Sequence, residues 1–123
     1  MKNYATILIT FLAFAIAGCG NAQKKVGHKD ISVTEFRNLD FEYQLVDVRT
    51  PEEFVSGAIE GAENIDYFNA EFLAEMSKFD KEKPVVLYCR SGRRSANAAE
   101  NLIEAGFKEV YNVEGGYLEY SKQ

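Results

Sequence analysis

The sequence is poor in several residue types on which metal and redox sites depend. Its 123 residues include no tryptophan, one histidine (His28), two prolines and two cysteines, Cys19 and Cys89. The two cysteines lie far apart, so there is no C-x-x-C motif, which excludes a thioredoxin-like dithiol cycle. His28 stands alone in a polar segment, where we expect its side chain to be solvated and assign it no chemistry. We expect neither a metal nor an organic cofactor.

Positive charge is in the minority as well. The chain has 14 lysines and arginines against 19 aspartates and glutamates, and its formal net charge is −5. A chain with this balance, and without a basic stripe to override it, has no general attraction to nucleic acid. The sequence also lacks internal repeats and low-complexity tracts. We therefore expect a single globular unit that does not bind nucleic acid.

The longest apolar run lies at the N-terminus. Lys2 precedes ATILITFLAFAIA, residues 5–17, which is shorter than the roughly 20 residues of a membrane-spanning helix. A positive residue followed by a short apolar run is typical of a secretory signal. The run ends in IAGC at residues 16–19, which resembles the lipobox of bacterial lipoproteins. An uncleaved anchor or a buried helix is the alternative.

The lipobox resemblance implies how the chain is processed and where it resides. Residues 1–18 would be a signal peptide, and Cys19 would become the lipidated N-terminus of a membrane-anchored protein. We expect such a protein in the cell envelope of a bacterium, on the periplasmic side or the surface. The polar residues 19–29 would form a tether, and residues 30–123 are the usual size of one domain, expected to be monomeric. Loss of Lys2 would lower the net charge by one, from −5 to −6.

Strand-like and helix-like segments alternate after the tether. Strands are predicted at residues 30–32, 43–49, 62–67, 84–89 and 109–116, and helices at 33–39, 50–57, 69–80, 94–107 and 117–123. Thr34 and Thr50 are the expected N-caps of the first two helices, with Pro51 at the first position of the second. This alternation predicts an α/β domain with a largely parallel sheet.

Cys89 occupies a notable place in this pattern. If Cys19 carries lipid, Cys89 is the only free thiol, and an unpaired cysteine in an exported protein indicates a reactive thiol or an intermolecular disulfide. A small buried side chain is the alternative. Cys89 sits at the carboxyl end of the most buried predicted strand, immediately before a helix, and sites in parallel sheets form beyond such strand ends. Its position makes it a candidate nucleophile.

The segment CRSGRR, residues 89–94, has the composition of an anion cradle. Gly92 can adopt positive φ, so the backbone can turn successive N–H groups inward at the start of a helix near Arg93. Such surroundings lower a thiol pKa from about 8.5 to ~3.5–7.5. Cations at a helix N-terminus oppose its dipole, which favours an anionic ligand over a solvated basic face. The candidate substrate-binding residues are Arg90, Ser91, Gly92, Arg93 and Arg94, around a cysteine that carries either sulfur or phosphorus.

Three segments together resemble the single-domain rhodaneses: LVDVRTPEEFVSGAIEGAENI at residues 45–65, VVLYCRSGRRS at 85–95 and NVEGGYLEY at 112–120. They occur in the family's usual order and spacing, and the similarity spans about residues 31–120. The resemblance implies a rhodanese-like α/β fold, with a five-stranded, mainly parallel sheet and helices on both faces. It also implies a sulfurtransferase in which Cys89 cycles between thiolate and persulfide.

The same resemblance assigns further residues. Asp47 and Arg49 match the family's DVR, near the site and partly structural, and we include both among the candidate substrate-binding residues. Glu53 is the expected partner of Arg49. Arg94 matches the position where the family most regularly has arginine, whereas Arg93 stands at a variable one.

The chain departs from the family pattern at two positions. Ala58 replaces a common histidine, and Tyr120 stands where tryptophan is frequent. Neither change touches the sulfur chemistry, but both leave the substrate preference open. Pro51, Gly115 and Gly116 match turns of the family and are expected to be architectural.

The expected function is transfer of a sulfane sulfur from a thiosulfate-like or persulfide donor, through a Cys89 persulfide, to cyanide or a thiol acceptor. The main rival is a cysteine-dependent phosphatase of the same fold, whose loop is C-x5-R; here Cys89 to Arg94 is C-x4-R, which is short for a phosphoryl group. A non-catalytic binding module is disfavoured by the presence of Cys89. A redox role for the same thiol in the envelope stays open.

Overall fold

The computed structural model of the chain describes residues 27–123. The predicted signal peptide, Cys19 and most of the predicted tether lie outside this range. The strands are β1 Lys29–Ile31, β2 Gln44–Asp47, β3 Glu63–Asn64, β4 Val85–Tyr88 and β5 Val110–Val113. The helices are α1 Val33–Arg37, α2 Pro51–Val55, α3 Phe72–Met76, α4 Arg93–Glu104 and α5 Gly116–Tyr120.

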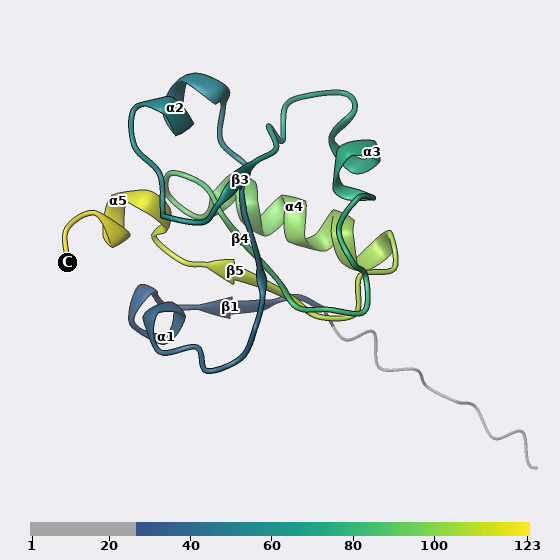
Figure 1. The fold of residues 1–123 in the computed structure, drawn as a ribbon, viewed down its shortest axis with the longest axis horizontal. Helices are drawn as coiled ribbons and strands as arrows, with labels where there is room; N and C mark the ends of the chain where they lie inside the picture. The colour runs from purple at the N-terminus through teal and green to yellow at the C-terminus, as the bar shows by residue number, and fades with distance from the viewer. Residues whose placement is uncertain (1–26) are drawn as a thin grey trace, which may run out of the picture.

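The five strands form one sheet in the order β1-β5-β4-β2-β3, and every neighbouring pair is parallel (Figure 1). β4 lies at its centre, and all four of its residues are buried. Parallel strands joined by helical crossovers are covered on both faces, which explains the uninterrupted apolar run of β4. The predicted α/β class and mainly parallel five-stranded sheet are confirmed.

Alternate residues of β4, together with Cys89, which follows it, face opposite layers of the core. Val85, Leu87 and Cys89 lie in one hydrophobic cluster, whereas Val86 and Tyr88 lie in the other. Because successive side chains of a strand point to opposite faces, each face needs its own cover. α3 and α4 supply core residues on the Cys89 side, and α1 and α5 pack on the Tyr88 side. Helices therefore cover both faces, as predicted.

The helix caps agree with the sequence at α2 and differ at α1. Thr50 caps α2 and forms a capping box with Glu53, with Pro51 at the first position. The cap of α1 is Ser32, whose side chain accepts from the Glu35 N–H at 3.0 Å, so the expectation of Thr34 was wrong. The buried Val33 already belongs to this helix, which places the cap one residue before it.

The first described residues already take part in the sheet or pack beside it. β1 begins at Lys29, where it pairs with Tyr111 of β5. The His28 side chain is only 13% exposed, and its Nε2 lies 3.2 Å from Asp30 Oδ1. The expectation of a solvated histidine was therefore wrong, because His28 directly precedes the edge strand and has a carboxylate partner two residues later. In the part of the chain that the structure describes, no helix has the length and apolar character needed to cross a membrane.

Candidate active site

Cys89 lies in the turn between β4, the central strand, and α4, the longest helix of the described residues. β4 ends at Tyr88, and α4 begins at Arg93 after a tight turn at Gly92, whose φ is +100°. A side chain at Gly92 would also crowd the backbone, because a Cβ there would lie 3.2 Å from the Gly115 nitrogen. The predicted positive φ of Gly92 is confirmed. Cys89 itself is only 1% exposed and packs in the core layer beneath α4.

The start of α5 supports the other side of this turn. The backbone N–H of Tyr117 donates to the Cys89 carbonyl at 2.8 Å, and that of Leu118 donates to the Arg90 carbonyl at 3.0 Å. Gly116 allows this approach, because a Cβ at that position would collide with the Cys89 carbonyl oxygen and lie 2.7 Å from the Arg90 carbonyl. The C-terminal helix therefore fixes the backbone of the cysteine loop.

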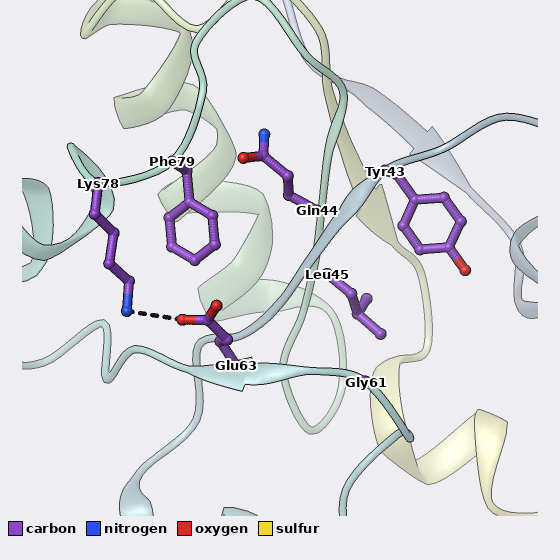
Figure 2. Close-up of a pocket in the computed structure, with 7 residues that line it drawn as sticks. All are labelled: Tyr43, Gln44, Leu45, Gly61, Glu63, Lys78 and Phe79. Atoms are coloured by element: carbon purple, nitrogen blue, oxygen red, sulfur yellow. Dashed lines mark ion pairs between the residues drawn. The ribbon is translucent and has the colours of Figure 1, made fainter.

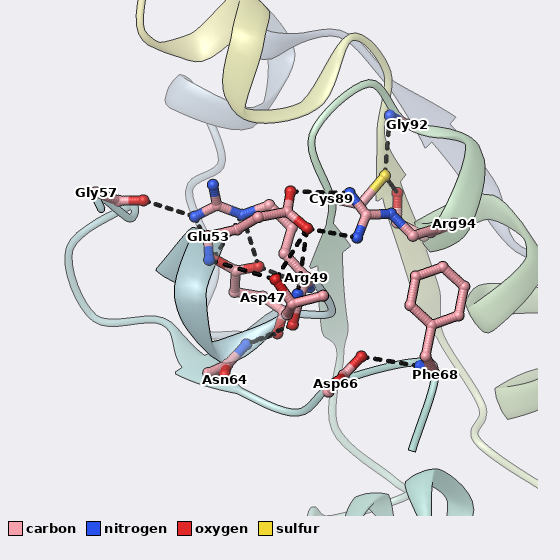
Figure 3. A network of polar contacts seen from close by, with 12 residues as sticks. Asp47, Arg49, Glu53, Gly57, Asn64, Asp66, Phe68, Cys89, Gly92 and Arg94 are labelled. Atoms are coloured by element: carbon pink, nitrogen blue, oxygen red, sulfur yellow. Dashed lines mark hydrogen bonds and ion pairs between the residues drawn. The ribbon is translucent and has the colours of Figure 1, made fainter. Parts of the chain in front are cut away.

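Cys89 Sγ accepts hydrogen bonds from the turn and from the first residues of α4. The Gly92 amide lies 3.1 Å from the sulfur (Figure 3). The Ser95 hydroxyl of α4 lies 3.4 Å from it. Burial is the largest single influence and raises the thiol pKa, but bonds from the Ser95 hydroxyl and from the amides of Ser95, Gly92 and Ser91 outweigh it. The pKa of Cys89 is therefore lowered from its ordinary value. Hydrogen-bond donors thus favour the thiolate in a site that is nearly closed to solvent.

Arg94 is held by a carboxylate from another helix. Its Nη1 and Nη2 donate to the two carboxylate oxygens of Glu53 at 2.7 and 2.9 Å. Arg94 is the main cause that lowers the pKa of Glu53 to about 2, against the opposing effect of burial. The pKa of Arg94 is raised, chiefly by Glu53 and to a smaller extent by Cys89. The expected partnership of Glu53 with Arg49 was wrong, because the carboxylate of α2 points toward the start of α4.

Asp47 and Arg49 form their own buried pair at the end of β2. Arg49 Nε donates to both carboxylate oxygens of Asp47 at 3.0 Å, and Arg49 Nη2 donates to Asp47 and to the Gly57 carbonyl, each at 2.6 Å. The guanidinium also lies over the ring of Tyr117 at 4.5 Å. Asp47 is fully buried and Arg49 is 3% exposed. These contacts give the pair a structural role beside the loop, and its predicted part in substrate binding stays a prediction.

The remaining loop residues lie at the surface. Ser91, Arg90 and Arg93 are all exposed. Among residues 27–123, neither Arg90 nor Arg93 takes part in an ion pair, in contrast to Arg94. The predicted loop residues are therefore brought together around Cys89, with two cations left available to an anion that approaches from solvent.

Two further residues lie at the site, Ser95 beside Cys89 Sγ and Asn112 beside Ser95, and neither is among the site residues predicted from the sequence. Ser95 is fully buried, and its hydroxyl bonds to Asn112 Oδ1 of β5 at 2.5 Å as well as lying near Cys89 Sγ. Ser95 directly follows the arginines of the loop, and Asn112 is the one amide within the otherwise apolar strand VYNV. A lone polar residue in a buried strand needs a partner, and this signal points to Asn112.

A separate surface hollow lies at the opposite end of the strands and offers no comparable chemistry. The hollow has a volume of about 380 Å³, and Lys78 and Glu63 form an ion pair of 2.7 Å in it. Figure 2 shows the side chains that line it. It is lined by Tyr43, Gln44, Leu45, Gly61, Glu63, Lys78 and Phe79. The lining contains no cysteine or serine nucleophile, and Gln44 begins β2, whereas Cys89 follows the carboxyl end of β4. The cysteine loop is therefore the better candidate site.

Together, the parallel sheet and the thiolate-stabilising loop define the class of the protein: an α/β domain with a nucleophilic cysteine in a strand-to-helix turn. The family model for the rhodanese-like domain matches residues 21–123. The chain therefore belongs to the rhodanese-like domain family.

Individual relatives agree with this assignment. The Bacillus subtilis protein YqhL is 34% identical over 122 residues, which cover 98% of this chain and 94% of the relative. A putative mitochondrial thiosulfate sulfurtransferase of Schizosaccharomyces pombe is 35% identical, with 76% of this chain and 80% of the relative covered. The structure of a human single-domain sulfurtransferase, TSTD1, superposes with a TM-score of 0.66 at 30% identity, covering 79% of this chain and 98% of the human one.

Proposed function

We propose that the protein is a sulfurtransferase whose nucleophile is Cys89. The observation that carries the proposal is the thiolate-stabilising geometry at Cys89 Sγ, with donors at 3.1 and 3.4 Å in a closed turn. Hydrogen-bond donors that lower the pKa of Cys89 favour its thiolate, which is the nucleophilic form of the side chain. The names of the yeast and human relatives, which both include a sulfurtransferase, support the same activity.

The reaction with a thiosulfate-like donor proceeds in two displacements. The Cys89 thiolate attacks the outer sulfur of thiosulfate, the sulfur–sulfur bond of the donor breaks, and sulfite leaves with the bonding electron pair. The product is a Cys89 persulfide anion. Cyanide or a thiolate acceptor then attacks the terminal sulfur, the bond to Cys89 breaks, and the thiolate returns. The exposed cations Arg90 and Arg93 would attract the anionic donor, and the loop amides would hold the persulfide.

The ion pair between Arg94 and Glu53 favours sulfur transfer over phosphatase activity. In a phosphatase loop of this kind, an arginine fork binds two oxygens of the phosphoryl group. Here both terminal nitrogens of Arg94 already bind Glu53, at 2.7 and 2.9 Å. A single sulfur atom needs no such fork, whereas a phosphoryl group would have to displace Glu53. The short C-x4-R loop points in the same direction.

The proposal is tested by mass spectrometry of the peptide that contains Cys89. After treatment of the protein with thiosulfate, this peptide should gain one sulfur atom, and the gain should disappear on addition of cyanide. Cys89→Ser should show no gain, while its circular dichroism stays that of the wild type. Hydrolysis of phosphate esters that depends on Cys89, without sulfur uptake from thiosulfate or persulfide donors, would contradict the proposal.

We also propose that Cys19 carries a lipid that anchors the domain in the bacterial envelope. The support comes from the sequence alone: Lys2, the apolar run at residues 5–17 and the IAGC box in that order. Metabolic labelling with a fatty-acid analogue should mark the wild type, and Cys19→Ala should abolish the label. Labelling that persists in Cys19→Ala would overturn the lipobox interpretation, whereas Cys89→Ser serves as the matched cysteine control and should label normally.

A further inference from the structure

A continuous polar chain runs from Cys89 to the edge of the sheet. The Ser95 hydroxyl lies 3.4 Å from Cys89 Sγ and 2.5 Å from Asn112 Oδ1. Asn112 Nδ2 in turn donates to Asp30 Oδ1 at 3.0 Å. Asp30 is a residue of the edge strand β1, and its side chain is 47% exposed. A nearly closed thiol is thus linked through two buried side chains to a carboxylate at the surface.

The orientation of Asn112 is fixed by its other partners. Its Nδ2 group donates to Asp30 Oδ1 at 3.0 Å and to the Gly92 carbonyl at 3.3 Å. A carboxylate and a carbonyl oxygen can only accept hydrogen bonds, so the NH₂ group must face them. Turning the amide over would bring its oxygen against two acceptors. The amide oxygen of Asn112 therefore faces Ser95.

Ser95 consequently has two acceptors and one proton. A serine hydroxyl donates a single hydrogen bond. Once Cys89 is ionised, its Sγ can only accept, and Asn112 Oδ1 at 2.5 Å also only accepts. The proton of Ser95 can satisfy the thiolate or the amide oxygen, but not both. Because Ser95 is fully buried and Asn112 is 3% exposed, solvent does not readily supply a second donor.

We propose that Asn112, held in place by Asp30, is a positioning residue that competes with the Cys89 thiolate for the single hydroxyl proton of Ser95. The inference rests on the proposed role of Cys89 as the nucleophile. The competition limits how far the thiolate is stabilised. Thiolates of very low pKa are weaker nucleophiles, so a moderated thiolate attacks a sulfur donor faster once it is formed.

Charged groups around Cys89 also change its thiol pKa. A test has to distinguish their effect from the competition for the Ser95 proton. Arg94, paired with Glu53, approaches the sulfur from α4, and Asp30, paired with His28, lies behind Asn112 on β1. Removing the Asp30 carboxylate would lower the thiol pKa by simple electrostatics even without any competition. An electrostatic effect does not require the Ser95 hydroxyl, whereas the competition does.

The test is the pH dependence of Cys89 alkylation by iodoacetamide, followed on the Cys89 peptide by mass spectrometry so that Cys19 does not contribute. Asn112→Leu should move the midpoint of the profile down by roughly 0.5–1 pH unit, the worth of about one hydrogen bond. Ser95→Ala should move it up. In a Ser95→Ala background, Asn112→Leu should no longer lower the midpoint. A midpoint that does not fall in Asn112→Leu, or that falls equally with and without Ser95, would overturn the proposal.

A second variant, Asp30→Ala, tests the proposal without replacing the buried Asn112, whose substitution could prevent folding. Asp30→Ala removes a half-exposed carboxylate and frees the Asn112 amide to turn, so the midpoint should again fall more in the wild-type than in the Ser95→Ala background. Glu114→Ala is the matched control: the Cα of this exposed residue lies beside Gly92, its side chain has no hydrogen bond to the polar chain, and its removal should shift the midpoint equally in both backgrounds. An equal shift for Asp30→Ala in both backgrounds contradicts the competition. Because alkylation needs no sulfur donor, its outcome is independent of whether the protein transfers sulfur.

Discussion

The ion pair between Glu53 and Arg94 shows how single residues shape the loop. Both side chains are partly buried, at 27% and 21% exposed, and they join α2 to the first turn of α4. The same glutamate completes the capping box of α2 through Thr50. One carboxylate therefore completes the cap of α2 and binds Arg94 in the first turn of α4. Its contribution to stability depends on pH.

Glu53→Gln should destabilise the protein near neutral pH by about 1–2 kcal/mol, allowing for solvent screening of a partly exposed pair. The folded-state pKa of Glu53 is about 2, below the ordinary value of 4.5. A depressed pKa stabilises the fold above the unfolded value and loses that stabilisation as pH falls from about 4.5 toward 2. Urea unfolding curves of variant and wild type should converge over this interval.

The control for this prediction is Glu52→Gln, which changes the neighbouring, exposed carboxylate of the same helix turn. It should change the free energy of unfolding by less than about 0.5 kcal/mol at either pH. A gap between Glu53→Gln and wild type that is the same at low and neutral pH would show that the pair does not act through the ionised carboxylate.

Some residues of the site could be predicted from the sequence and others could not. The cysteine, the turn glycine and the basic loop could be predicted, because they are contiguous in the chain. The partner of Glu53 could not, because Arg49 is close in sequence whereas Arg94 is close in space. Ser95 directly follows the loop segment 89–94 but carries no distinguishing signal, since a serine at the start of a helix is common.

At the scale of elements, the contact between α5 and the cysteine loop sets the shape of the site. The first amides of α5 bind the carbonyls of Cys89 and Arg90. Each predicted strand and helix overlaps an observed one, yet β3 covers only residues 63–64 of the predicted 62–67, and α3 covers residues 72–76 of the predicted 69–80. Asp66 and Asn69 accept from the amides of Phe68 and Glu71 just before it, and such local turns compete with helix formation.

Gly116→Ala should destabilise the protein and disturb the cysteine loop by more than the strain of its positive φ alone would cause. Gly116 and Gly61 both have positive φ, at +53° and +87°, but a Cβ meets nothing within 4 Å at Gly61 and collides with the Cys89 carbonyl at Gly116. Gly61→Ala should therefore cost about 1 kcal/mol of conformational strain and leave alkylation of Cys89 unchanged. Gly116→Ala should cost more than about 2 kcal/mol and change the alkylation rate. If urea unfolding shows the same loss of stability for Gly61→Ala and Gly116→Ala, the cysteine loop shifts to accommodate the added methyl group and the prediction is wrong.

At the scale of the whole molecule, the sheet order determines which distant residues meet at the thiol. β5 lies between β1 and β4, so Asp30 on β1 and Asn112 on β5 lie beside Cys89, which directly follows β4, although the three are far apart in sequence. The alternation of strands and helices predicts a parallel sheet but not its register. The polar chain behind Cys89 depends on that register, in which Asp30 is paired with Asn112, and could not be read from the sequence.

The central claim, that Cys89 accepts and passes on a sulfur atom, is tested most directly by a sulfur balance. The protein is mixed with thiosulfate, and the sulfite released is measured against the persulfide on the Cys89 peptide. One sulfite per persulfide, followed by one thiocyanate per persulfide when cyanide is added, is the predicted result, and Cys89→Ser should give none of the three. Sulfite or thiocyanate formed at the wild-type rate by Cys89→Ser would contradict the account.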